Sequence, residues 1–316
     1  MPRPREALPE EWMHAPFRRS EALARGVTPA RLDASDLSAP FQTVRAPAGP
    51  LDPARIAAAY ALRQGPDQAI SHTSALLLWG APLPRRVETA EAIHVSSIGA
   101  SRPRTRLTIP HLLQQERVHL AVHGELVMTD AATSWVQSAP LLGLDDLVAA
   151  GDFLITGTEP FDGASPLVAR EDLHRAIVRN HGARGIRRAR EALELIRYGP
   201  LSRRESFLHL MMRRGNLPPA ELNHRVRDDT GREVHMVDAA HVRYRVATEF
   251  ESLLHLDPAK FRRDIRKQQE LAAIGWATHR LTSDDVDPRL HTPASRAAIA
   301  RIRSTLLERG WDPTRE

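Results

Sequence analysis

The chain has 316 residues, of which 42% are hydrophobic and 26% charged, so it can form two or three domains with apolar cores and is not broadly disordered. It contains no cysteine, which excludes disulfides, thiolate-ligated zinc and cysteine nucleophiles. The net charge is +5, and residues 196–280 account for all of it, with 16 Lys or Arg against 11 Asp or Glu.

Residues 1–50 predict a small winged helix-turn-helix-like unit. A helix is expected from about Ser20 to a C-capping Gly26, and Thr28 and Pro29 have the residue types that open a second helix. The segment "FQTVRAP" then predicts a short wing strand. A helix-glycine-helix with a wing is typical of DNA-binding units, although plain helical hairpins share this spacing.

Residues 51–198 predict a mixed α+β domain. The segment "LDPARIAAAYAL" has the apolar stripe of a helix, and a short helix is expected from Thr73 to Gly80. The segments "EAIHVSS", "RTRLTIPHL" and "VHGELVMTD" alternate as strands do. From "GLDDLVAAGDFLI" to Tyr198, apolar spacings of three and four residues predict helices.

Five histidines between residues 72 and 123 are candidate metal ligands: His72, His94, His111, His119 and His123. Only His119 and His123 have a close spacing, which suits a helix face, whereas their surroundings indicate strand and turn. We therefore interpret all five as core or surface histidines.

Residues 199–316 predict a domain with the element order α-β-β-α-β. Its first helix has Ser202 as N-cap and Gly215 as stop. The remaining elements are the strands "REVHMVDAA" and 244–251, a long helix after Asp257-Pro258, the strand "WATHRLT", and a terminal helix near residues 293–309.

The acids of this domain predict a metal site. In a strand over residues 244–251, Glu249 and Glu251 point to one face, and paired carboxylates indicate open solvent or a bound cation. Asp238 closes the preceding strand and can join Glu249 as an oxygen ligand of Mg²⁺ or Mn²⁺. His255 follows closely and is placed to accept or deliver a proton.

This pattern resembles the PD-(D/E)XK nucleases, and among them the very-short-patch-repair-like endonucleases. The resemblance is carried by Asp238, "EFE" at 249–251, His255, "FRRDIRKQQELAAIGW" and "RLTSDDV". It implies a restriction-endonuclease-like fold in which Asp238 and Glu249 bind the metal, Glu251 takes the second acidic position, and His255 assists catalysis. Glu205 matches an acid on the opening helix that supports the site in some relatives.

The sequence also departs from this pattern. Ser252 replaces the usual glycine, and Leu253-Leu254 stand where polar residues are common, which changes the metal position or the substrate access. Four basic residues on the long helix are expected either to bind phosphates or to form a solvated face: Arg262, Arg263, Arg266 and Lys267. Asp264 and Lys267 have the spacing of a plain intrahelical pair.

Upstream segments resemble actinobacterial AbiEi-type antitoxin-like proteins: "PFRRSEALARGVTPARL", "ISHTSALLLWGAPLP" and "DDLVAAGDFLI". We expect an α+β protein with boundaries at residues 1–50, 51–198 and 199–316. Its expected function is that of a Mg²⁺-dependent DNA endonuclease, as a monomer or a homodimer. The alternatives are a DNA-binding regulator or antitoxin with an inactive nuclease-like domain, and a protein-interaction scaffold. The start of the chain lacks the apolar core of a signal peptide, so a cytoplasmic location without a membrane partner is expected.

Overall fold

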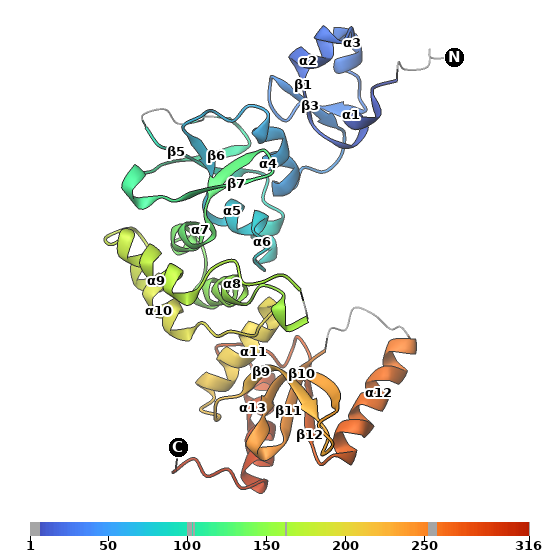
Figure 1. The fold of residues 1–316 in the computed structure, drawn as a ribbon, viewed down its shortest axis with the longest axis vertical. Helices are drawn as coiled ribbons and strands as arrows, with labels where there is room; N and C mark the ends of the chain where they lie inside the picture. Colours follow the sequence, from blue (N-terminus) through green and yellow to red (C-terminus); the bar gives the residue numbers. More distant parts are fainter. Residues whose placement is uncertain (1–6, 100–102, 104, 162, 252–257, 316) are drawn as a thin grey trace. The chain divides into compact units, whose positions relative to one another are not determined.

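The computed structural model describes residues 7–99, 103, 105–161, 163–251 and 258–315, with the side chains of 258–262 left out. The chain divides into two compact units (Figure 1). The first consists of Met1–Leu142 and Glu171–Ala189, and the second of Gly143–Arg170 and Arg190–Glu316. These limits do not coincide with boundaries at residues 50 and 198, and the three-part division stays a prediction.

The first unit opens with short helices and a three-stranded antiparallel sheet of order β1-β3-β2. The elements are α1 (Glu10–His14), β1 (Phe17–Arg18), α2 (Arg19–Ala24), α3 (Pro29–Leu32), β2 (Leu37–Ser38) and β3 (Val44–Pro47). The backbone N–H of Arg31 donates to Thr28 Oγ1 at 3.3 Å, which confirms the expected cap of α3. The expected wing strand is β3, the centre of the sheet. Whether this is a winged helix stays a prediction.

A five-stranded mixed sheet of order β6-β5-β4-β8-β7 forms the core of the first unit. Its strands are β4 (Gln68–Ile70), β5 (Ile93–Ser97), β6 (Thr108–Leu112), β7 (Leu120–His123) and β8 (Leu126–Thr129). Its helical elements are α4 (Pro53–Ala61), α5 (His72–Leu78), α6 (Arg85–Glu88), the 3-10 turn η1 (Gln115–Arg117), α7 (Ala131–Ser138) and α9 (Arg170–Arg179). The single strand expected over "VHGELVMTD" is instead the hairpin β7–β8, because Gly124 adopts φ +61° and reverses the chain.

The second unit is built on a four-stranded sheet of order β12-β11-β10-β9. Its strands are β9 (Glu221–Arg227), β10 (Glu233–His241), β11 (Val246–Phe250) and β12 (Ala277–Leu281). Its helical elements are α8 (Leu144–Thr156), the 3-10 turns η2 (Glu159–Phe161) and η3 (Val242–Tyr244), α11 (Arg203–Arg214), α12 (Pro258–Ala273) and α13 (Pro293–Glu308). The helix α10 (Ile186–Leu195) runs across the limit between the units. No helix among the described residues is both long and apolar enough to span a membrane.

Two sequence-based expectations for this unit are wrong: one strand was not predicted, and another begins later than expected. Strand β9 precedes the two expected strands, so the order is α-β-β-β-α-β-α; its residues are mostly polar because it is an edge strand, and only Val226 is fully buried. The strand expected from residue 244 begins at Val246, because Arg245 adopts φ +50°, a left-handed conformation incompatible with a strand.

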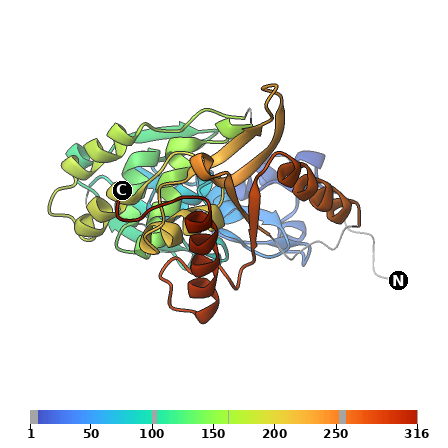
Figure 2. The same cartoon turned by 90° about the horizontal axis from the view of Figure 1, so that it is seen from below.

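The sheet of the second unit carries apolar residues on both faces, and neighbouring residues such as Ala239 and Ala240 belong to different faces. One cluster contains Ala239 and Val246 and packs with α11 and α13. The other contains Ala240 and Ala247 and packs with Leu271 of α12. Figures 1 and 2 show α12 and α13 on different sides of these strands.

A buried carboxylate joins α8 to α11. Asp152 is fully buried; it accepts a hydrogen bond from the backbone N–H of Arg197 at 2.7 Å, and its Oδ2 lies 2.8 Å from Nε2 of His209. Two further ion pairs link the same helices: Asp146 with Arg203, and Asp145 with Arg214, each at 2.6 Å. The hydrogen bonds of Asp152 therefore hold α8 against α11 and the segment that contains Arg197.

Replacing Asp152 by Ala is expected to destabilise the second unit by about 3 kcal/mol, because the Arg197 amide and the His209 imidazole lose their buried partner. Chemical denaturation followed by circular dichroism measures this loss. The matched variant Asp229→Ala removes an exposed carboxylate of the same unit and is expected to change stability by less than about 0.5 kcal/mol. Equal effects of the two variants would contradict the fixing role of Asp152.

Candidate active site

The acids expected to bind metal lie on neighbouring strands. Ala239 of β10 pairs with Thr248 of β11, and Asp238 and Glu249 are the next residues of the two strands beyond this pair. The two carboxylates are close enough for Glu249 to raise the pKa of Asp238. Asp238 is partly buried and Glu249 is only 8% exposed. The backbone N–H of Phe250 donates to Asp238 Oδ2 at 2.7 Å, which fixes that carboxylate.

Lys267 of α12 completes this pair. Its Nζ forms an ion pair with Oε1 of Glu249 and donates a hydrogen bond to the carbonyl of Met236 at 2.9 Å. The sequence placed Lys267 among residues that bind phosphates or face solvent. The structure places it against the acids, where its charge compensates a buried carboxylate.

The electrostatics of this group raise the pKa of Asp238 to about 7. Burial is the main cause, and the negative charges of Glu205 and Glu249 add to it; the Phe250 N–H and the positive charge of Lys267 act in the opposite direction. A carboxyl group with a near-neutral pKa can exchange protons at physiological pH, which is a property of acid–base and metal-binding groups.

Two further predicted acids have partners of their own. Glu205 Oε2 accepts hydrogen bonds from the Leu201 backbone N–H at 2.9 Å and from Asn223 Nδ2 at 3.0 Å. Glu251 lies just beyond β11 and is bound by Arg280 at 2.8 Å. From the sequence we predict that Glu249 and Glu251 flank one cation. In the structure Glu249 pairs with Lys267, whereas Glu251 pairs with Arg280. A catalytic role for Glu205 or Glu251 stays a prediction.

Only some of the remaining predicted residues lie in the part of the chain that the structure describes. His255, Ser252 and Leu253-Leu254 lie outside the described residues, as does the side chain of Arg262. Arg263 and Arg266 are exposed on α12, where they can reach an external phosphate.

The donor set fits a small hard divalent cation. Mg²⁺ takes oxygen ligands and commonly uses one or two carboxylates, with water and substrate phosphate completing its shell. Asp238 and Glu249 supply two such carboxylates. Burial first, and then the charges of Glu205 and Glu249, raise the pKa of Asp238, and a bound cation would offset both effects. Among the described residues, acids do not gather in a cluster of three or more ligand atoms. The fit is therefore to a metal held by two carboxylates.

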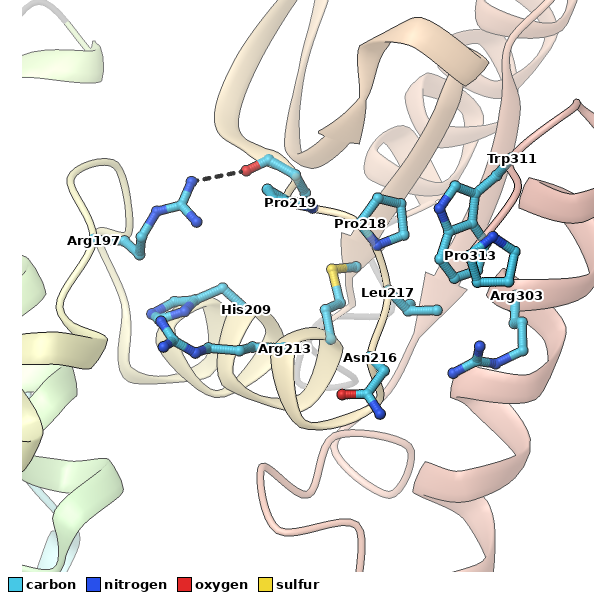
Figure 3. A pocket seen from close by; sticks show the side chains of 12 residues that line it. Arg197, His209, Arg213, Asn216, Leu217, Pro218, Pro219, Arg303, Trp311 and Pro313 are labelled. Carbon is cyan, nitrogen blue, oxygen red and sulfur yellow. Dashed lines mark hydrogen bonds between the residues drawn. The ribbon is translucent and has the colours of Figure 1, made fainter. Parts of the chain in front are cut away.

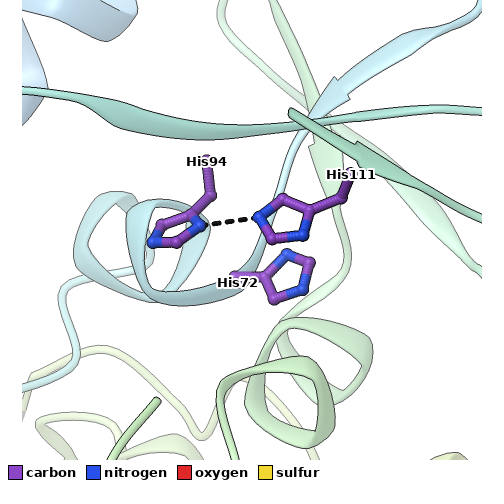
Figure 4. A group of neighbouring side chains, drawn as sticks. All are labelled: His72, His94 and His111. Atoms are coloured by element: carbon purple, nitrogen blue, oxygen red, sulfur yellow. Dashed lines mark hydrogen bonds between the residues drawn. The ribbon is translucent and has the colours of Figure 1, made fainter. Parts of the chain in front are cut away.

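Three histidines that the sequence analysis did not join lie together in the first unit (Figure 4). His94 of β5 and His111 of β6 place Nδ1 and Nε2 2.8 Å apart, and the ring of His72 stacks on that of His111 with centroids 3.8 Å apart. Burial first, then the nearby imidazoles, lowers the pKa of His72 well below its usual value and that of His94 to about 4. Their wide sequence spacing concealed the cluster; the parallel pairing of β5 with β6 creates it.

A separate cavity of about 680 Å³ lies in the second unit beside the C-terminal half of α11 (Figure 3). Arg197, Arg213 and Arg303 line it together with His209 and Trp311. The acids of the candidate site are not among its lining residues. Arg197 and Arg303 donate to the backbone carbonyls of Ala220 and Gly215, so these guanidinium groups also brace the cavity wall.

Comparisons with known proteins give distant relatives only. No family model and no solved structure matches the chain. Two proteins of Mycobacterium tuberculosis are similar to it, "Uncharacterized protein Rv2248" of strain ATCC 25618 / H37Rv and "Uncharacterized protein MT2308" of strain CDC 1551 / Oshkosh. Each is 34% identical over 119 residues, which is 37% of this chain and 44% of the relative. The match therefore spans less than half the length of these relatives.

Replacing Asp238 by Asn is expected to change stability in a pH-dependent way. Because the folded pKa is raised, the contribution of Asp238 to wild-type stability is fully present below about pH 4 and is lost as the pH rises through about 7. The Asn variant avoids this loss and can still accept the hydrogen bond of Phe250. The shift corresponds to at most about 4 kcal/mol, and partial exposure reduces the expected gain above pH 7 to about 2 kcal/mol.

Denaturant unfolding of both proteins in EDTA, repeated across this pH range, measures the difference. Asp229→Asn, which alters an exposed carboxylate, serves as the control and is expected to show no such pH dependence. A stability difference between Asp238→Asn and wild type that stays constant with pH would show that Asp238 ionises normally.

Proposed function

We propose that this chain is a metal-dependent endonuclease that hydrolyses DNA phosphodiesters. The observation that carries the proposal is the convergence of Asp238, Glu249 and Lys267 from β10, β11 and α12 on one site. Two carboxylates beside an ammonium group, with a basic segment around them, suit a reaction in which a phosphate gains negative charge.

Asp238 and Glu249 would hold the Mg²⁺ or Mn²⁺ ion. When bound, the ion supplies positive charge at the scissile phosphate and lowers the pKa of a nearby water. The Phe250 N–H keeps the Asp238 carboxylate oriented, and the Met236 carbonyl fixes the ammonium of Lys267. Lys267 can thus donate a hydrogen bond to a phosphate oxygen without leaving its position beside Glu249.

The reaction consumes one water for each bond cut. The water oxygen forms a new bond to phosphorus, the bond between phosphorus and one deoxyribose oxygen breaks, and that oxygen takes up a proton. The proton that the attacking water releases passes to solvent, because Asp238 and Glu249 are ionised when they ligate a metal. Arg263 and Arg266 are exposed on the helix that carries Lys267 and are proposed to contact neighbouring phosphates.

The neutralisation of the acidic side chains by basic ones favours a second function, DNA binding without cleavage. Lys267 neutralises Glu249 and Arg280 neutralises Glu251 without any added cation, as expected of a domain that binds but does not cut. The alternative is therefore a DNA-binding regulator or antitoxin that uses residues 18–46 for recognition. Its DNA affinity would survive chelation of metal, whereas cleavage would not.

Cleavage of plasmid DNA and of labelled duplex and single-stranded oligonucleotides tests the proposal, with Mg²⁺ or Mn²⁺ compared with EDTA. We expect metal-dependent cutting by the wild type. Glu249→Gln and Lys267→Gln are each expected to reduce the rate roughly 100-fold or more, because each removes a charge at the reacting phosphate.

The control Glu191→Gln makes the same chemical change at an exposed site of the second unit and is expected to cut as the wild type does. Cutting that persists unchanged in Glu249→Gln would identify a contaminating nuclease. If the wild type neither cuts DNA nor binds Mg²⁺ or Mn²⁺ by calorimetry, yet retains DNA in EDTA, the regulator is the function that remains.

A further inference from the structure

The histidine cluster of the first unit has the composition of a transition-metal site. His72, His94 and His111 each offer one ring nitrogen, and these three atoms all lie within 4.8 Å of one another. The three side chains are partly buried, so a bound ion would be held by protein yet remain reachable from solvent. Neutral imidazole nitrogens are preferred ligands of zinc and its neighbours, and not of Mg²⁺.

The fold brings these residues together from three separate elements. His94 and His111 lie on adjacent parallel strands, in a register that pairs His111 with Ser96, and His72 is the first residue of α5. The ring centroids of His72 and His111 are 3.8 Å apart, those of His94 and His111 5.0 Å, and those of His72 and His94 5.4 Å. Stacked imidazoles supply little attraction of their own that would justify burying three of them together.

The backbone at His72 is held in a costly conformation. Its φ is +54°, which non-glycine residues rarely adopt. Its Nδ1 lies 2.8 Å from Ser71 Oγ, and Ser71 Oγ in turn accepts a hydrogen bond from Ser96 Oγ at 2.6 Å. Both serines are fully buried, so these contacts orient the ring through its Nδ1. In the tautomer whose Nδ1 donates its proton to Ser71 Oγ, Nε2 is the atom suited to a metal.

We propose that His72, His94 and His111 bind one Zn²⁺ ion through three nitrogen ligands, with the fourth coordination position open to water or a small ligand. Two nitrogens on a tetrahedral zinc are about 3.3 Å apart when each bond is about 2.05 Å. The 2.8 Å between His94 and His111 thus has to open by about half an ångström, which side-chain rotation provides. Three ligands and an open position are the arrangement of catalytic and regulatory zinc sites, whereas purely structural sites use four.

The test uses the full-length chain without a histidine tag, stripped of metal by a chelator and then titrated with Zn²⁺ or Co²⁺. We expect one equivalent of zinc by elemental analysis and the visible absorption of tetrahedral Co²⁺, which Zn²⁺ abolishes. His72→Asn is the most informative variant, because Asn tolerates a positive φ and removes only the imidazole. This variant and His94→Asn are expected to weaken binding roughly 100-fold, since even supporting groups of zinc sites are worth 10–100-fold.

Two controls make the outcome decisive. His174→Asn changes an exposed histidine of α9 in the same unit, and Glu249→Gln changes the proposed magnesium site; both should keep one equivalent and the Co²⁺ absorption. Circular dichroism confirms that each variant is folded. A wild type that takes up no Zn²⁺ or Co²⁺, or a folded His72→Asn that binds them as the wild type does, would overturn the proposal. Loss of binding in Glu249→Gln alone would assign the metal to the acids of the second unit.

Discussion

The ion pair between Glu249 and Lys267 is the constraint on which the second unit depends. A carboxylate that is only 8% exposed is costly to bury without a compensating charge, and the strand that carries Glu249 offers none. The cation comes from α12, so α12 has to lie across β10 and β11. The small residues Ala240 and Ala247 beneath the helix allow the close approach that lets Lys267 reach both Glu249 and the Met236 carbonyl. Packing and electrostatics thus impose the same helix position.

The two clusters of candidate ligands differ in chemistry, and each matches its own surroundings. The carboxylates of the second unit lie beside cationic side chains and accept a backbone N–H, which suits hard cations and phosphates. The imidazoles of the first unit contact one another and buried serine hydroxyls, in surroundings that favour neutral nitrogen ligands. The two proposed sites therefore call for different metals, a hard divalent cation at the carboxylates and a transition metal at the imidazoles.

Local signals in the sequence were sufficient for most elements. Thr28, Ser202 and Pro258 begin helices where capping rules require, and the terminal helix α13 lies within one residue of its expected limits. Long-range pairing was not accessible: β9 has too few apolar residues to be recognised until β10 lies beside it. The metal-binding roles of Asp238 and Glu249 remain predictions, but their juxtaposition was expected. The position of Lys267 beside Glu249 and the clustering of the three histidines result from contacts between segments far apart in the sequence, so residue spacing does not predict them.

The parallel pairing of β11 with β12 has a consequence for how the chain acquires its site. Asp238 and Glu249 meet in a local hairpin between β10 and β11, whereas Lys267 reaches them only when the crossover through α12 has closed. The meeting of the two acids thus rests on a short-range contact, and their charge compensation rests on a long-range one. Local unfolding that released α12 would leave the two carboxylates side by side without Lys267.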